Sequence, residues 1–166
     1  MSIAVTYNSQ ASIVETREGE YISPGDPTVT TNGLNTTAGL TASTTPPVTK
    51  YSAFQKALST GTGTIDLTSL PDANGVAAQV DFTGLKLQVV KLRNLATNAN
   101  AITVEVGASD GHTLFGATWE ITLQPGDEFL WKGNDNSGVP NVASNNKAID
   151  ISGTGSQILE VLLVAG

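Results

Sequence analysis

Apolar and polar residues alternate through most of residues 51–166, which is the pattern of half-buried β-strands. In residues 101–106, for example, Ile102, Val104 and Val106 fall on one face of an extended chain, and polar residues separate them. Turn sequences rich in Gly, Pro, Asn and Asp separate such segments. The pattern predicts about seven or eight short strands, at the spacing typical of β-sandwiches and barrels.

The predicted strands in this region are 51–58, 63–67, 85–95, 101–106, 119–123, 128–132, 147–152 and 158–164. Within 85–95 the alternation changes phase at Val89 and Val90, which predicts a β-bulge or a strand that changes sheets. Residues 158–164 are nearly all apolar, so we expect them at the centre of a sheet or in a subunit contact. Residues 48–58 are the one segment for which a helix is a plausible alternative.

Residues 1–50 are poorer in large apolar side chains. Short strands are predicted at 3–7, 11–16 and 19–22, before a turn-forming cluster at 23–27. Residues 28–50 are rich in Thr, Asn, Gly and Ala and cannot bury much apolar surface. An unstructured loop of this length is uncommon inside a compact domain, so we expect it to be disordered or ordered by a partner.

These patterns together predict an all-β chain with one domain. Residues 51–166 form an antiparallel β-sandwich of jelly-roll or immunoglobulin-like type, and residues 1–50 form an extended N-terminal arm. The composition agrees, because only 14% of residues are charged while Gly numbers 17 and Pro 7. Thr, Ser and Asn fill polar positions where helical surfaces would carry Glu, Lys and Arg.

The charge of the chain argues against two classes of partner. The net charge is -7, and the 8 Lys and Arg residues are scattered, so we expect neither nucleic acid nor an anionic membrane as a ligand. No apolar run approaches the roughly 20 residues of a membrane helix, and no export signal is evident at the N-terminus. Without cysteine, disulfides and thiolate metal sites are excluded.

The sequence offers no catalytic motif, and we expect no enzymatic activity. The single histidine, His112, is interpreted as a turn residue on a solvated hairpin, since no Gly-x-Ser-x-Gly elbow accompanies it. The carboxylates fall at outward strand positions or in turns, where they favour solubility. Residues 134–136 and Asp110 are rich in oxygen ligands but lack the calcium-loop spacing, so we predict no metal and no cofactor.

The pattern predicts different degrees of burial for the two tryptophans. Trp119 is in phase with Ile121 and Leu123, which predicts a place in the core. For Trp131 a core position and an exposed glycan platform are both compatible with the pattern. An alternative function is therefore a carbohydrate- or receptor-binding module of a phage tail or adhesin, which would use Trp131, Tyr51 or the loop at 134–146.

Five segments within residues 62–166 can be compared with known proteins, both in sequence and in strand order. They are KLQVVKLRN at 86–94, NANAITV at 98–104, WEITLQPGD at 119–127, KAIDISGTG at 147–155 and EVLLVAG at 160–166. In these segments the chain resembles small structural proteins of tailed bacteriophages. The resemblance implies a β-sandwich virion component, either a capsid decoration (cement) protein or a minor head or tail protein. It transfers no site residues, because such proteins act through surfaces.

The expected function is therefore that of a capsid decoration protein, made in the host bacterial cytoplasm and located in the virion. Its expected partners are the major capsid protein or other virion proteins, and further copies of itself. The resemblance to phage structural proteins favours a trimer. The candidate contact residues lie in the arm, at its junction with the sandwich and on one strand. They are Thr28, Val29, Leu34, Leu40, Pro46, Pro47, Tyr51 and Trp131.

Overall fold

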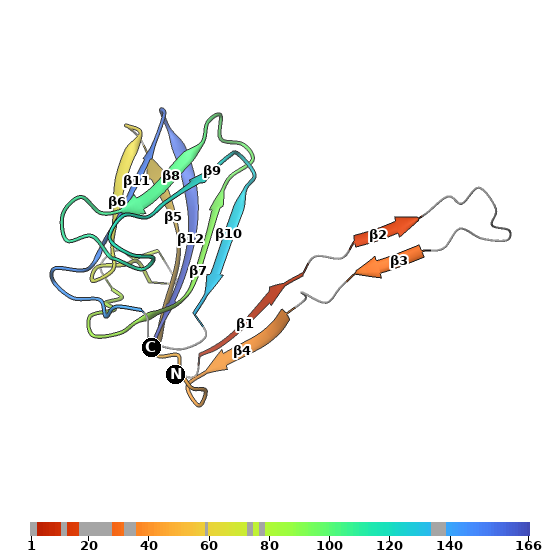
Figure 1. Ribbon diagram of the computed structural model, residues 1–166. Helices are drawn as coiled ribbons and strands as arrows, with labels where there is room; N and C mark the ends of the chain where they lie inside the picture. Colours follow the sequence, from red (N-terminus) through yellow and green to blue (C-terminus); the bar gives the residue numbers. More distant parts are fainter. Residues whose placement is uncertain are drawn as a thin grey trace, which may run out of the picture.

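The computed structural model describes residues 3–10, 13–16, 28–31, 36–58, 60–72, 75–76, 79–133 and 139–166. These residues form strands and loops, and none of them is helical. Two antiparallel sheets of four strands each lie face to face (Figure 1). The predicted all-β sandwich is therefore confirmed, while its finer assignment to a jelly-roll or immunoglobulin-like type stays a prediction.

One sheet, which we call the arm-side sheet, consists of β10 (Glu128–Lys132), β7 (Leu87–Asn94), β12 (Gln157–Ala165) and β5 (Lys50–Leu58), in that spatial order. The opposite sheet has the order β6 (Thr62–Asp66), β11 (Ala148–Gly153), β8 (Ile102–Val106) and β9 (Glu120–Leu123). Residues 50–58 are thus a strand, and the helical alternative for this segment is wrong.

The main core fills the space between the two sheets. Leu58, Ile102, Leu159 and Leu163 are fully buried there, together with Phe82 from the loop before β7. Burying a side chain of this kind contributes about 1.5–3 kcal/mol, which is why the alternating residues of the strands point inward. The inward positions match those read from the alternation, because a strand places every second residue on one face.

Strand β12 runs through the middle of the arm-side sheet, as its apolar sequence predicts. It pairs with β5 along one side and with β7 along the other. The pairing with β7 shifts at the end of the strand, where Val164 lies opposite Val89 and Ala165 lies opposite Leu87. Gln88 is the extra residue, so the predicted bulge is present, next to the expected position.

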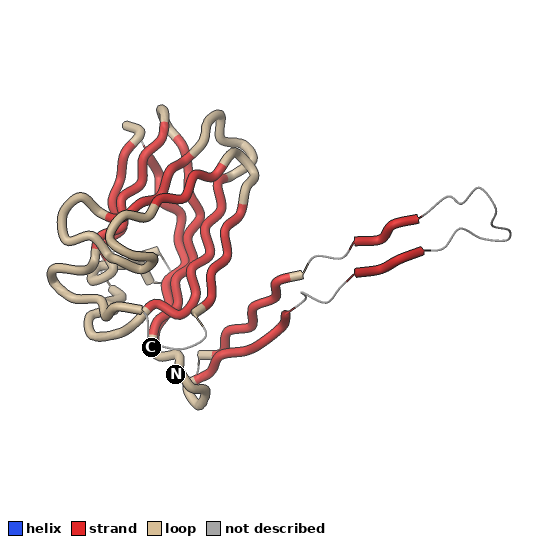
Figure 2. The backbone as a smooth tube through the Cα atoms, in the orientation of Figure 1, coloured by secondary structure: helices blue, strands red, loops and turns tan. Residues whose placement is uncertain are grey.

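The N-terminal region forms a two-stranded ribbon that projects from one end of the sandwich (Figures 1 and 2). Near the sandwich, β1 (Ala4–Ser9) pairs with β4 (Thr36–Thr41), and further out β2 (Ile13–Thr16) pairs with β3 (Thr28–Thr31). We call this ribbon the arm. The strand predicted at 19–22 lies outside the described residues.

The expectation that residues 28–50 are disordered or need a partner to order them is wrong for β3 and β4. Both strands are paired within the chain, to segments that precede them by more than ten residues. The weak apolar content of this region hid the pairing, because a ribbon is held by backbone hydrogen bonds that any sequence can supply.

Candidate interaction surface

The root of the arm is fixed to the outer face of the arm-side sheet by a second apolar cluster. Leu40, Val48, Val89 and Val164 are buried in it, with exposed fractions of 5% or less. The partly buried side chains of Ile3, Val5, Tyr7 and Tyr51 pack around these four residues. Burial alternates along β1, so its inward residues touch the sheet and its outward residues face solvent.

The turn from the arm into the sandwich is held by polar contacts. The Thr44 hydroxyl accepts a hydrogen bond from the Thr41 amide at 3.0 Å, and the Val48 amide donates to the Thr41 carbonyl at 2.9 Å. The amide group of Gln88 in the β7 bulge donates to the Pro47 carbonyl at 2.6 Å. The bulge therefore does more than bend β7, because it ties the sheet to the connection that carries the arm.

The outer face of the arm-side sheet is organised in rows, because residues directly opposite each other on neighbouring strands point to the same side. The row under the arm, the covered row, contains Tyr51, Val164, Val89 and Lys132. The next, the middle row, contains Ala53, Leu162, Lys91 and Leu130. The third, the charged row, contains Gln55, Glu160, Arg93 and Glu128.

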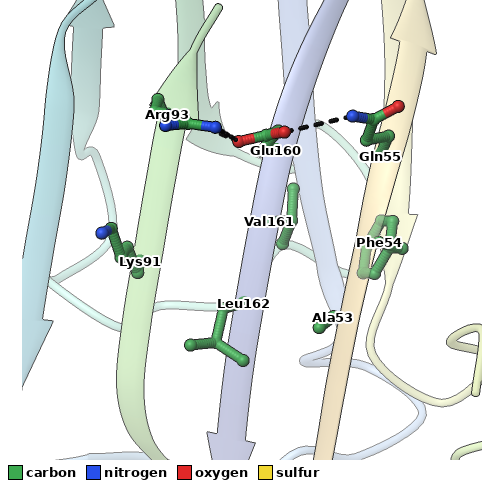
Figure 3. Close-up of a pocket in the computed structure, with 8 residues that line it drawn as sticks. All are labelled: Ala53, Phe54, Gln55, Lys91, Arg93, Glu160, Val161 and Leu162. Carbon is green, nitrogen blue, oxygen red and sulfur yellow. Dashed lines mark hydrogen bonds and ion pairs between the residues drawn. The ribbon is translucent and has the colours of Figure 1, made fainter. Parts of the chain in front are cut away.

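The charged row is a continuous polar network across the sheet, and Figure 3 shows its part from Gln55 through Glu160 to Arg93. The side chain of Gln55 donates to Glu160 at 3.1 Å, and Arg93 Nε donates to the other oxygen of Glu160 at 2.6 Å. Glu128 lies 3.7 Å from Arg93 and 3.2 Å from Lys91. The hydrogen bond from Gln55 lowers the pKa of Glu160, and Arg93 lowers it further, since both favour the carboxylate.

Two grooves flank Leu162 of the middle row. One, of about 460 Å³, lies over Ala53, Leu162 and the charged row. The other, of about 450 Å³, lies between β1 and the sheet and is lined by Ile3, Val5, Tyr51 and Val164 together with Leu162. The apolar surface beneath the arm root therefore continues into the uncovered part of the face.

A further contact ties the arm to the far edge of the sheet. The ammonium group of Lys132 on β10 lies 5.0 Å from the centre of the Tyr7 ring on β1. A cation over an aromatic face at this distance is stabilising. Together with the apolar cluster, this contact sets the direction in which the arm leaves the sandwich.

The predicted contact residues fall into separate groups. Leu40 and Pro46 are buried within their own chain, where they anchor the arm root, while Tyr51 is partly buried and Pro47 is exposed. Thr28 and Val29 belong to β3, opposite Thr16 and Glu15 of β2. Leu34 lies outside the described residues. Trp131 lies on the inner face of the arm-side sheet, where it packs against the main core.

Trp131 belongs to an aromatic cluster at the edge of the main core. Its ring is partly buried and meets Phe115 edge to face, with ring centres 5.4 Å apart. Phe115 also meets Trp119 and Phe129 edge to face and is itself 38% exposed. Trp119 is 8% exposed, which confirms its predicted place in the core. The place of Phe115 in this cluster could not be predicted, because it lies in a loop without periodicity.

The interpretation of His112 as a solvated turn residue is wrong. It is 0% exposed, its amide donates to the Ala148 carbonyl at 2.7 Å, and its carbonyl accepts from the Trp119 indole at 2.9 Å. Burial lowers the pKa of the imidazole to about 4, since the charged form loses its hydration. The surrounding Gly and Asp residues suggested a surface turn, but the loop folds inward over the core.

Acidic residues in the turns serve local structure, and the carbonyl of Asp110, which was weighed as a calcium ligand, accepts hydrogen bonds from the amides of Lys147 and Ala148. Asp66 accepts from the amide and hydroxyl of Thr68, and Asp81 accepts in the same way from Thr83. Within the described ranges, no three His, Cys, Asp or Glu residues are grouped so that they could hold a metal ion. Residues 134–136 of the oxygen-rich loop lie outside those ranges.

Comparisons with known proteins supply no relative. No protein-family model, no curated protein and no solved structure matches this chain. In the part of the chain that the structure describes, no helix has the length and apolar character to cross a membrane.

Proposed function

We propose that the chain is a non-enzymatic structural subunit of a virus particle, and that it assembles through its arm. The observation that carries the proposal is the ribbon of β1 to β4, rooted on the arm-side sheet and extending beyond the sandwich (Figure 1). A rigid module with a projecting ribbon is suited to linking neighbouring subunits.

The energetics of the ribbon support this proposal. An isolated two-stranded ribbon is marginally stable in water, since it buries little apolar surface. Near the sandwich the second cluster compensates for this, but Asn8, Ser9, Thr36 and Thr37 are all exposed where the ribbon leaves the sheet. A partner surface that covers these exposed residues would supply the burial that the chain itself does not.

The finer assignment rests on the resemblance of residues 62–166 to structural proteins of tailed phages. On that basis we propose a capsid decoration protein that binds the head lattice, located in the virion. The partners would be the major capsid protein and further copies of the chain, with a trimer as the proposed oligomer.

Native mass spectrometry of the purified chain, followed by co-sedimentation with phage capsids that lack it, tests the proposal. We expect an oligomer and saturable binding at a fixed number of copies per capsid. The sandwich of an unrelated protein of similar charge serves as the control for nonspecific sedimentation. A chain that stays monomeric and never sediments with capsids would falsify the proposal.

A further inference from the structure

We propose that the middle row of the arm-side sheet, with the groove beside it, is the docking site for the arm of a second copy of this chain. The inference rests on the proposed assembly through the arm and names the surface that receives it. It is carried by the composition of this face, by its continuity with the arm root and by charge.

The middle row is apolar apart from Lys91, whose ammonium group lies 3.2 Å from the Glu128 carboxylate of the charged row. Ala53 is exposed, Leu162 is partly buried, and Leu130 is 38% exposed although it is a large apolar residue. The charged row borders this apolar strip on one side (Figure 3), and β1 borders it on the other. An apolar centre within a polar rim is the usual arrangement of a protein interface.

The same face already holds a ribbon of this kind within the chain. Ile3, Val5 and Tyr7 of β1 pack against it, together with Leu40 of β4. Leu162 lines both the groove under β1 and the uncovered groove, so the two surfaces are continuous. A second ribbon laid beside β1 would therefore lie on a surface that continues, through Leu162, from the one under the first ribbon.

Charge favours the arm over other parts of a second copy. On the outer face of the sheet, Lys91 and Arg93 are paired with Glu128 and Glu160, and Lys132 beside Tyr7 adds one further positive charge, in a chain whose net charge is -7. Residues 1–49 carry Glu15, Glu18, Glu20 and Asp26 against Arg17 alone. An acidic arm therefore meets less repulsion on this face than on the acidic remainder of the chain.

Each copy thus has one arm to donate and one uncovered strip to receive an arm. Because donor and acceptor are different surfaces, the contact is heterologous, and a closed ring of copies satisfies every arm. The ring is compatible with the trimer of the proposed function.

A matched pair of variants tests the acceptor surface. Ala53 and Ala57 lie on the outer face of β5 and both are exposed, but only Ala53 lines the groove. Ala53→Arg fills the groove and should weaken self-association by about tenfold or more, whereas Ala57→Arg should leave it unchanged. Sedimentation velocity measures the association, and circular dichroism checks that both variants fold.

A cross-linking experiment identifies the occupant without relying on a loss of binding. A photoreactive amino acid replaces Ala53, and ¹⁴N and ¹⁵N chains are mixed before irradiation. Tryptic cleavage at Arg17 and Lys50 isolates the arm in the peptides 1–17 and 18–50. We expect cross-links between chains of different isotope composition, and we expect them to end in these two peptides.

Other outcomes separate this inference from the proposed function. Cross-links to the sandwich, or only within one isotope, overturn the inference, as does an Ala53→Arg chain that associates normally. If such a chain or the wild type still binds capsids, the proposed function stands without the inference. If the wild type neither associates nor binds capsids, both fall together.

Discussion

At the scale of single residues, His112 couples the folded state to pH. The imidazole is buried, with a pKa of about 4 in the folded chain, against 6.5 for a solvated histidine. Its folded pKa is depressed, so its contribution to stability is complete above pH 6.5 and is lost as the pH falls toward 4. The full loss corresponds to about 3 kcal/mol.

Replacement of His112 by Leu should remove this pH dependence. We expect the urea midpoint of the wild type to fall between pH 7 and pH 5, and that of His112→Leu to stay nearly constant, whatever its value at pH 7. Asp66, Asp81 and Glu160 also have lowered pKa values, but they affect stability only nearer to their own solution pKa values, below about pH 5. Equal slopes for the two chains would contradict the role given to His112.

The loop that buries His112 also depends on a close backbone approach at Gly111. A Cβ atom added there would lie 2.2 Å from the carbonyl oxygen of Gly107 and 2.6 Å from the Val106 side chain. We expect Gly111→Ala to lower the free energy of unfolding by more than about 2 kcal/mol. Gly39→Ala is the control, because the nearest atom to its added Cβ lies at an ordinary 3.6 Å. Urea denaturation of both variants measures the difference, and a near-neutral Gly111→Ala would count against this close packing.

At the scale of elements, the arm root and the sandwich have separate cores. Leu40 packs in the second cluster, whereas Leu159 packs in the main core. We expect Leu40→Ala to release β1 and β4, with a loss of about 2–4 kcal/mol that is confined to the arm root. Leu159→Ala removes a similar volume but should destabilise the whole sandwich.

Hydrogen exchange distinguishes these two results. In Leu40→Ala, the amides of β1 and β4 should exchange faster while those of β7 and β12 keep their protection. In Leu159→Ala, protection should fall in every strand of the sandwich. Loss of protection in β12 on Leu40→Ala would show that the arm root and sandwich unfold as one unit.

At the scale of the whole molecule, the sequence predicted the sandwich and the first two strands of the arm, but not the strands β3 and β4 that pair with them. Residues 101–106 and 158–164 carry strong alternation or continuous apolar character, so their places could be inferred locally. Strands β3 and β4 could not, since their pairing to β2 and β1 leaves no local periodicity. The rows of the outer face also could not be predicted, because they require the register between β10, β7, β12 and β5.

The separation of the two cores leads to a prediction about the sandwich alone. Among the residues whose burial the structure describes, those of the main core all lie at or after Phe54. A chain that begins at residue 42 should therefore fold cooperatively, with the near-ultraviolet circular dichroism of Trp119 and Trp131 retained. It should also expose Val89, Val164 and Tyr51, which Ile3, Val5 and Leu40 no longer cover.

The exposed apolar surface gives this shortened chain a measurable difference from the full one. We expect it to bind a fluorescent apolar dye more strongly and to aggregate at lower concentration. Without the arm, the covered row becomes exposed, and it is contiguous with Leu162 and Leu130 of the middle row. Changing Val89 to Thr in the shortened chain should reduce both effects, because Thr keeps the β-branched shape but adds a hydroxyl. An unfolded shortened chain would show instead that the arm root is part of the sandwich core, and dye binding equal to that of the full chain would show that another segment covers the face.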